Sequence, residues 1–319
     1  MAIEPEQVEH QTPEMSVNPR GDLLNSIEKP ALREKVASLR ADGPYDWISL
    51  FPRVSGWGAP GEVKRHVKLL RAVEPRLEQL MFPDERIEFV TNGVLNSFVE
   101  QYFMGIWAFV INQTIFLFTN YRVVLVNWDG KKKARAMMWQ IPYGRLKKYN
   151  AAVNFGSLGF KLSSGGTHKF VKVPRGDRKR LKEFMAAKLE QARTDGDVFP
   201  CHTDRDPLCP GCAAPLPPKS PSCPECLDEF VRPSTPMLFS MLLPGLGHLY
   251  LGHIALGVMV MLGFIFFAFV MIMIVVRDGL SALPFALIAL ACAIGVDALV
   301  TRHVARKGVL SKRLAWRGY

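Results

Sequence analysis

Four cysteines form the clearest chemical pattern in the sequence. Cys209-Pro-Gly-Cys212 and Cys223-Pro-Glu-Cys226 are two C-x-x-C pairs separated by ten residues. Each pair can wrap a short turn around a metal ion, and four thiolates complete the tetrahedral shell of a structural zinc ion. The sequence therefore predicts a zinc site at Cys209, Cys212, Cys223 and Cys226. Two disulfides or a redox pair are the alternative interpretation of the same spacing.

His248, His253 and Asp297 form a second set that could do chemistry, as the metal site of an intramembrane enzyme. The two histidines are five residues apart, whereas metal-binding histidines on one helical face are about three or four apart. A catalytic zinc ion also needs three protein ligands and a base. The simpler interpretation places both histidines at the level of the lipid headgroups, with Asp297 hydrogen-bonded inside a helix pair.

A block of basic residues occupies the middle of the chain. Residues 121–182 contain 16 Lys or Arg against Asp129 and Asp177, a net charge of +14, although the whole chain is only +11. Such a block favours a polyanionic partner, and basic residues near anionic headgroups contribute about 1 kcal/mol each. The predicted lipid-binding or partner-binding residues are Lys131, Lys132, Lys133, Arg135, Arg145, Lys147 and Lys148. A solvated basic face without a ligand is the alternative.

Two apolar segments near the C-terminus predict a membrane anchor. Residues 254–276 contain no formal charge, residues 280–300 contain only Asp297, and Arg277-Asp278-Gly279 separates the two segments. As helices they would be about 34 and 31 Å long, enough to cross a hydrocarbon core of about 30 Å. The segment after Val300 is basic and has no acidic residue, so the positive-inside rule predicts a cytoplasmic C-terminus. Two spans then place the N-terminal part in the cytoplasm as well, against the bacterial inner membrane.

The basic part of the chain has the pattern of short strands followed by one helix. Turn signals separate β-branched or aromatic runs at residues 87–91, 103–111, 114–120, 122–128, 134–141, 146–153, 158–162 and 169–173. A helix capped by Asp177 should follow. This part contains no G-x-S-x-G motif and no Walker A loop, so we expect no catalytic centre there.

The N-terminal part has a different composition. Residues 1–20 are polar and contain no apolar run, which favours a disordered tail. Two helices are expected at residues 23–41 and 61–81, and Pro75 should kink the second. An apolar stripe that includes Val63, Val67 and Leu70 should pack on the strands that follow.

Three parts of the chain resemble known families. Thr119-Asn-Tyr-Arg122, the later Ile141-Pro142-Tyr143 and the closing helix are similar to bacterial PH and GRAM-like domains, which use a β-barrel to recognise lipid or protein. The part of the chain that contains the four cysteines, residues 200–230, is called the cysteine module. It resembles the minimal zinc ribbons beside the first span of many bacterial membrane proteins. Gly247-His248-Leu249-Tyr250-Leu251-Gly252, with Asp297 in the second span, resembles the TM2 family of two-span modules.

The sequence thus predicts a multidomain membrane protein with a PH-like β-barrel and C-terminal helix, a zinc ribbon and an α-helical transmembrane hairpin. We expect a non-catalytic, membrane-anchored adaptor or regulator that binds anionic lipid, or a membrane or cytosolic protein. A nucleic-acid-linked regulator is the alternative, but only Lys219 is basic between Cys209 and Cys226, so nucleic acid is not the expected partner. The predicted parts are the tail 1–21, helices 22–82, PH-like domain 83–195, ribbon 200–230, hairpin 236–301 and basic cytoplasmic tail 302–319.

Overall fold

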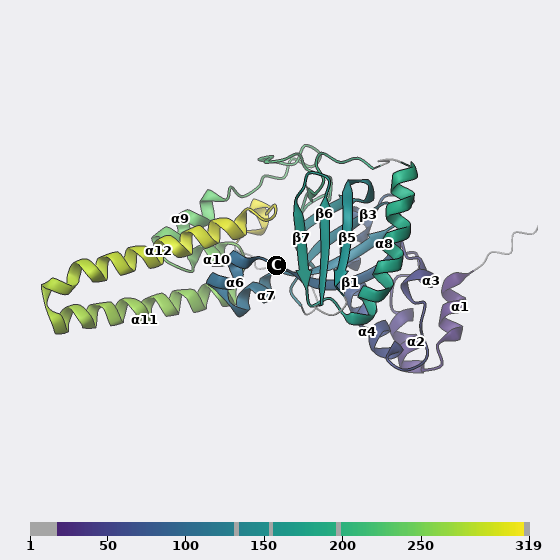
Figure 1. The fold of residues 1–319 in the computed structure, drawn as a ribbon, viewed down its shortest axis with the longest axis horizontal. Helices are drawn as coiled ribbons and strands as arrows, with labels where there is room; N and C mark the ends of the chain where they lie inside the picture. Colours follow the sequence, from purple (N-terminus) through teal and green to yellow (C-terminus); the bar gives the residue numbers. More distant parts are fainter. Residues whose placement is uncertain (1–17, 131–133, 153–155, 196–198, 316–319) are drawn as a thin grey trace, which may run out of the picture.

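The computed structural model describes residues 18–130, 134–152, 156–195 and 199–315. Figure 1 shows N-terminal helices at one end, a β-sheet in the middle and a pair of long helices that extends away at the other end. The helices of the first part are α1 (Pro19–Ser26), α2 (Pro30–Ala37), α3 (Trp47–Leu50), α4 (Ala59–Val73) and α5 (Leu77–Leu80).

Prolines divide the N-terminal helices. Pro30 is the first residue of α2, and its missing N–H group separates α2 from α1, where one continuous helix was expected. Pro75 lies in a 3-10 turn, Glu74–Arg76, which separates α4 from α5. The predicted apolar stripe is confirmed, because Val63, Val67 and Leu70 belong to one buried cluster with residues of the sheet.

The sheet has eight strands in the order β5-β6-β7-β1-β2-β3-β4-β8, and all its pairs are antiparallel. One face packs against the N-terminal helices, and a second core lies between the sheet and α8 (Arg175–Asp195). The strands are β1 (Ile87–Leu95), β2 (Gln113–Thr119), β3 (Arg122–Trp128), β4 (Ala134–Pro142), β5 (Leu146–Ala152), β6 (Ser157–Leu162), β7 (Thr167–Val171) and β8 (Asp206–Leu208).

The expected closed barrel is wrong, because β4 and β5 do not pair. A short segment from the cysteine-containing part of the chain, β8, occupies the outer edge of β4 instead, with Met138 opposite Leu208. The other edge, β5, lies beside α8, which packs on it (Figure 1). The result is an open antiparallel sheet with a C-terminal helix.

The expected strand at residues 103–111 is also wrong. This segment belongs to two short helices, α6 (Phe98–Met104) and α7 (Ile106–Ile111), joined at Gly105 with φ +53°. Figure 1 shows both helices beside the base of the long helices. A helix satisfies its own backbone hydrogen bonds, so it suits an apolar environment that offers no neighbouring strand.

The last part contains four helices: α9 (Ser234–Leu242), α10 (Leu246–Tyr250), α11 (Ile254–Asp278) and α12 (Leu283–Ala305). Two candidate spans, of 25 and 26 residues, are apolar and long enough to cross a membrane, and only 6% and 17% of their most apolar stretches are buried. The core helix of a soluble protein would be mostly buried. The two helices run out and back, so the chain before and after them lies at the same end of the pair (Figure 1).

Candidate metal centre and membrane junction

The structure brings the four predicted zinc ligands together. Cys209 Sγ lies 3.5 Å from Cys226 Sγ, and Cys212 Sγ lies 3.5 Å from Cys223 Sγ. All four sulfur atoms lie within 4.8 Å of one another. Metal–sulfur bonds of about 2.3 Å in a tetrahedron place neighbouring sulfurs about 3.8 Å apart. The cluster is therefore compatible with a metal ion held by four thiolates.

Two matching turns build this cluster. The amide of Ala213 donates to the carbonyl of Cys209 at 2.9 Å, and the amide of Leu227 donates to the carbonyl of Cys223 at 3.1 Å. Both Ala213 and Leu227 have positive φ, near +59°, which reverses the chain immediately after the second cysteine of each pair. The C-x-x-C spacing thus folds locally into the geometry that points two sulfur atoms to one centre.

Burial makes ionisation of two of the thiols costly unless a cation is bound. Cys209 and Cys223 are fully buried, and all six cysteines of the chain are free thiols. Burial raises the pKa of the Cys209 thiol strongly and raises that of Cys212 to about 11. A positive ion offsets the cost of ionising such thiols, because it stabilises the thiolate that binds it.

The cysteine module connects the sheet to the chain that follows α12. β8 joins it to β4, and on its other side Phe230 bridges to Ser311. The amide of Val231 donates to the carbonyl of Leu310 at 2.8 Å, and the amide of Lys312 donates to the carbonyl of Glu229 at 2.9 Å. The chain after α12, the predicted basic tail, thus contacts this module through Leu310, Lys312 and Arg313.

A buried ion pair fastens the sheet to the end of α12. Glu100 of α6 is fully buried and pairs with Lys307, whose ammonium group also donates to Asn112 Oδ1 at 3.1 Å. Burial lowers the pKa of Lys307, and the Glu100 carboxylate offsets part of that shift. The indole of Trp139 on β4 donates to the carbonyl of Lys307 at 3.0 Å. Sequence reasoning missed this pair, although Glu100 is the only charged residue between Phe98 and Phe118.

The helices α6 and α7 have one packed side and one open side. Met104, Ala108 and Ile111 are buried in one cluster with residues of α11 and α12. Their other side exposes large apolar side chains beside the spans: Phe98, Tyr102, Phe103 and Ile106. α9 similarly exposes Leu238, Met241 and Leu242. The apolar surface of the helix pair therefore continues onto α6, α7 and α9.

His248 and Asp297 belong to a hydrogen-bond network that holds the segment with Gly245 and His248, which precedes α11, against α12. His248 Nε2 lies 3.4 Å from Asp297 Oδ1 and 3.2 Å from Thr301 Oγ1, and the amide of Gly245 donates to Asp297 Oδ2 at 2.9 Å. Gly245 has φ +91°, and a Cβ there would lie 2.3 Å from the carbonyl oxygen of Gly257. The glycines of this loop thus allow close backbone packing.

The side chain of His253 contacts a different element, although its amide donates to the carbonyl of His248 at 2.9 Å. Its Nδ1 atom accepts a hydrogen bond from the guanidinium of Arg135 at 3.3 Å. Among the described residues, two groups of possible metal ligands come close together, and neither includes His248, His253 or Asp297.

The predicted basic residues do not form one cluster in the described part of the chain. Lys131, Lys132 and Lys133 lie outside the described residues. Arg135 lies at the start of β4, next to the entry to α11, whereas Arg145 follows the far end of that strand. Lys147 and Lys148 are exposed on the edge strand β5. The seven residue steps of strand from Arg135 to Pro142 span more than about 20 Å, which separates Arg135 from the others.

Thr119 and Arg122 of the Thr119-Asn-Tyr-Arg122 motif have a structural role at the β2–β3 turn. Arg122 and Glu85 are both almost fully buried and pair at 2.7 Å, and Thr119 Oγ1 donates to Glu85 Oε1 at 2.8 Å. The guanidinium of Arg122 also stacks on the rings of Phe82 and Phe199. Glu85 was not recognised from the sequence, because its partner lies 37 residues away.

The second group of possible metal ligands is Glu62, His66 and Asp177. Its carboxylates already have cationic partners: Arg65 pairs with Asp177 at 2.6 Å, and Arg180 pairs with Glu62. Burial alone would raise the pKa of Asp177, but His66, Arg65 and the Thr91 hydroxyl together lower it. Asp177, expected to cap α8, therefore joins that helix to α4 and β1.

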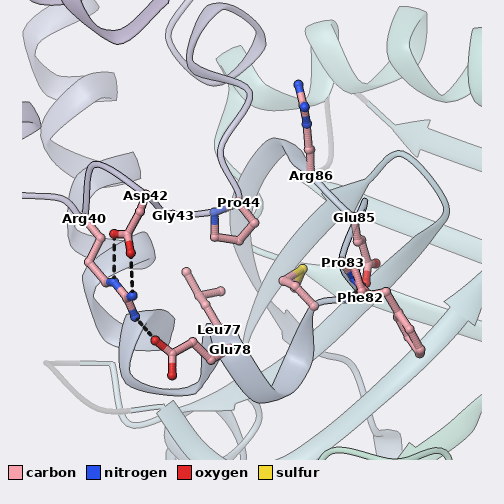
Figure 2. A pocket seen from close by; sticks show the side chains of 11 residues that line it. Arg40, Asp42, Gly43, Pro44, Leu77, Glu78, Phe82, Pro83, Glu85 and Arg86 are labelled. Carbon is pink, nitrogen blue, oxygen red and sulfur yellow. Dashed lines mark hydrogen bonds and ion pairs between the residues drawn. The ribbon is translucent and has the colours of Figure 1, made fainter.

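A surface cleft of about 250 Å³ lies between the N-terminal helices and the start of β1. Figure 2 shows Arg40 beside Asp42 and Glu78, with which it pairs at 3.0 and 2.6 Å. Arg86 points away from these groups in the same view. Glu85 also lines the cleft but is paired with Arg122, so the cleft offers no converging catalytic groups among its lining residues.

No protein-family model matches the chain, and no curated protein matches it at a significant level. The geometry itself therefore provides the basis for a functional assignment: an open antiparallel sheet, a four-cysteine cluster and two apolar helices held together in one unit.

Proposed function

We propose that this protein is a non-catalytic, membrane-anchored adaptor or regulator of the bacterial inner membrane. Its two apolar helices form a hairpin in the bilayer, and both ends of the chain lie in the cytoplasm. The PH-like sheet then recognises anionic lipid or a partner protein at the membrane surface, and a zinc ion holds the four-cysteine ribbon. The single observation that carries this proposal is the buried contact of α6 and α7 with the ends of α11 and α12.

This contact supports a fixed position of the sheet at the membrane. A sheet connected to its anchor by a flexible linker could occupy many positions, whereas Glu100 and Lys307 join the two parts through a buried charge pair. α6, which carries exposed aromatic residues, also lies beside the base of α11 and α12 (Figure 1). Aromatic side chains favour the boundary between water and hydrocarbon. α6 and α7 therefore enter the interfacial layer together with the spans.

Labelling by a lipid with a photoreactive diazirine in its acyl chain tests this position. The full chain is reconstituted in nanodiscs, irradiated and mapped by mass spectrometry. We expect label on α11, α12 and the exposed side of α6, near Phe98 and Phe103. Trp57 and Ile48 are the internal controls, because they are 97% and 66% exposed but lie in the N-terminal part. Label on the spans without label on α6 would contradict the proposal.

Metal analysis of the purified full chain tests the ribbon. We expect one zinc ion per chain, lost on Cys209→Ser or Cys226→Ser, because an incomplete thiolate shell loses much of its binding energy. Cys201→Ser and Cys292→Ser are matched controls, since neither residue belongs to the cluster. Zinc content that survives both cluster substitutions would contradict the assignment of the ligands.

A further inference from the structure

A large cleft lies between the cysteine module, the β4 edge of the sheet and the end of α12. Its volume is about 880 Å³. The residues that carry the argument are Trp139, Arg205, Lys219, Arg232, Arg306 and Lys307. The segments that form the cleft are far apart in the sequence, and the pairing of Val231 with Leu310 brings two of them together.

The lining is strongly basic. It contains five Lys or Arg and, among the described residues that form it, no Asp or Glu. Lys307 is committed to Glu100. Arg232 and Arg306 are exposed and make no ion pair with any described residue. Two guanidinium groups are thus available at the mouth of the cleft, and guanidinium binds phosphate oxygens in a bidentate manner.

Arg205 adds a third, ordered guanidinium to this surface. It stacks on the Trp139 ring at 4.5 Å and lies 3.1 Å from His168 Nδ1. Burial lowers the pKa of Arg205 to about 10, and its Nε atom is buried without a hydrogen-bond partner. A buried donor that lacks an acceptor is costly, so a ligand oxygen that reaches this atom would be stabilising.

The cleft lies at the level where the chain enters and leaves the apolar helices. Pro233 immediately precedes α9, and Arg306 immediately follows α12. Arg306 also lines a second hollow of about 280 Å³, together with Arg302 and His303. The remaining lining of that hollow is apolar: Phe103, Val296, Leu299 and Val300. A basic site therefore continues into an apolar groove along α12.

We propose that this cleft binds the phosphate of an anionic glycerophospholipid between Arg205, Arg232 and Arg306, with one acyl chain in the groove along α12. The proposal rests on the membrane position proposed above. The cationic part matches a phosphate, and the adjoining apolar groove matches the hydrocarbon chain of the same molecule. A soluble phosphate compound would use only the first part, and a nucleic acid would leave the groove empty.

Lipid binding to the detergent-purified full chain, measured by native mass spectrometry, tests the assignment. Phosphatidylglycerol is the probe, phosphatidylcholine is the zwitterionic comparison, and inorganic phosphate is the competitor. We expect the variant Arg232→Gln with Arg306→Gln to bind phosphatidylglycerol about 30-fold more weakly, since each basic residue contributes about 1 kcal/mol. Lys179→Gln with Lys182→Gln is the control, because it removes two exposed charges from α8 and should leave affinity unchanged.

The outcomes separate this inference from the proposed function. Selective loss in the Arg232 and Arg306 variant, with unchanged thermal stability, supports the lipid site. Equal loss in both variants would assign binding to diffuse charge and overturn the site. Displacement of the lipid by inorganic phosphate at equal concentration would assign the cleft to a soluble anion. A chain that inserts and carries zinc but shows no preference for phosphatidylglycerol would overturn the inference and leave the anchored ribbon intact.

Discussion

The ion pair between Glu100 and Lys307 should determine how firmly the sheet is fixed to the two long apolar helices. Glu100→Gln keeps the size of the side chain and removes its charge. The ammonium group of Lys307, whose side chain is 17% exposed, then keeps only the neutral oxygens of Asn112 and the new amide. Lys307→Met produces the converse defect, a fully buried carboxylate without its main cation.

The expected size of the effect follows from these burial values. Removal of one partner from a buried pair costs about 3–5 kcal/mol, because the other charge stays in a poorly solvated position. Because Lys307 is partly exposed, we expect Glu100→Gln to cost about 3 kcal/mol, the lower end of this range. Lys307→Met should cost more, because Glu100 is fully buried. The double variant leaves no unpaired charge, so it should cost less than the sum of the two single changes by about 2 kcal/mol or more.

Hydrogen exchange of the full chain in nanodiscs measures this effect where it occurs. Amides of α6 and α7 should exchange about 150-fold faster in Glu100→Gln, which corresponds to about 3 kcal/mol of local opening free energy. Amides of β3, a strand buried throughout, serve as the internal reference. Strictly additive effects in the double variant, or faster exchange spread evenly over the sheet, would refute the role assigned to the pair.

Three further predictions concern other parts of the molecule. An impermeant maleimide should label Gly279→Cys from the outside of intact cells, and labelling only after lysis would reverse the topology. In a denaturant titration, Arg122→Met should lower the free energy of unfolding by about 3–5 kcal/mol, because the buried Glu85 carboxylate loses its cation. The double variant Arg122→Met with Glu85→Leu should recover most of this loss. Asp177 has a lowered pKa in the folded protein, so its contribution is fully present above the unfolded pKa of about 3.9 and is lost as the pH falls through the folded pKa. Asp177→Asn should therefore destabilise the protein at pH 7, and thermal melts should show that its difference from the wild type shrinks as the pH falls below about 3.9.

Local patterns in the sequence predicted the local structures. The cysteine cluster was predictable because each C-x-x-C pair folds within five residues. The long helices were predictable because apolar runs of that length, with Asp297 as the one charged residue within residues 254–276 and 280–300, have few other stable positions in a soluble fold. The α4 stripe was predictable for the same reason, since helical periodicity shows which face must be buried.

Features that depend on distant segments were not predictable in this way. The apolar residues around Phe103 suit either a strand or a membrane-facing helix, and only the neighbouring spans decide between them. The barrel stays open because β8, more than 60 residues after β4, pairs with its edge. Lys307 and Asn112 are 195 residues apart, and no periodic pattern connects positions at that separation.

The bond between the cysteine module and the chain after α12 has a consequence for biosynthesis. Asp228 and Ser311 are 83 residues apart, and both long apolar helices, α11 and α12, lie between them. At translation rates of about 5–20 residues per second, Ser311 is synthesised roughly 4 to 17 seconds after Asp228. Ser311 can reach it only if the second span has returned the chain to the starting side. In the proposed topology, closure of this contact would therefore report correct insertion of both helices.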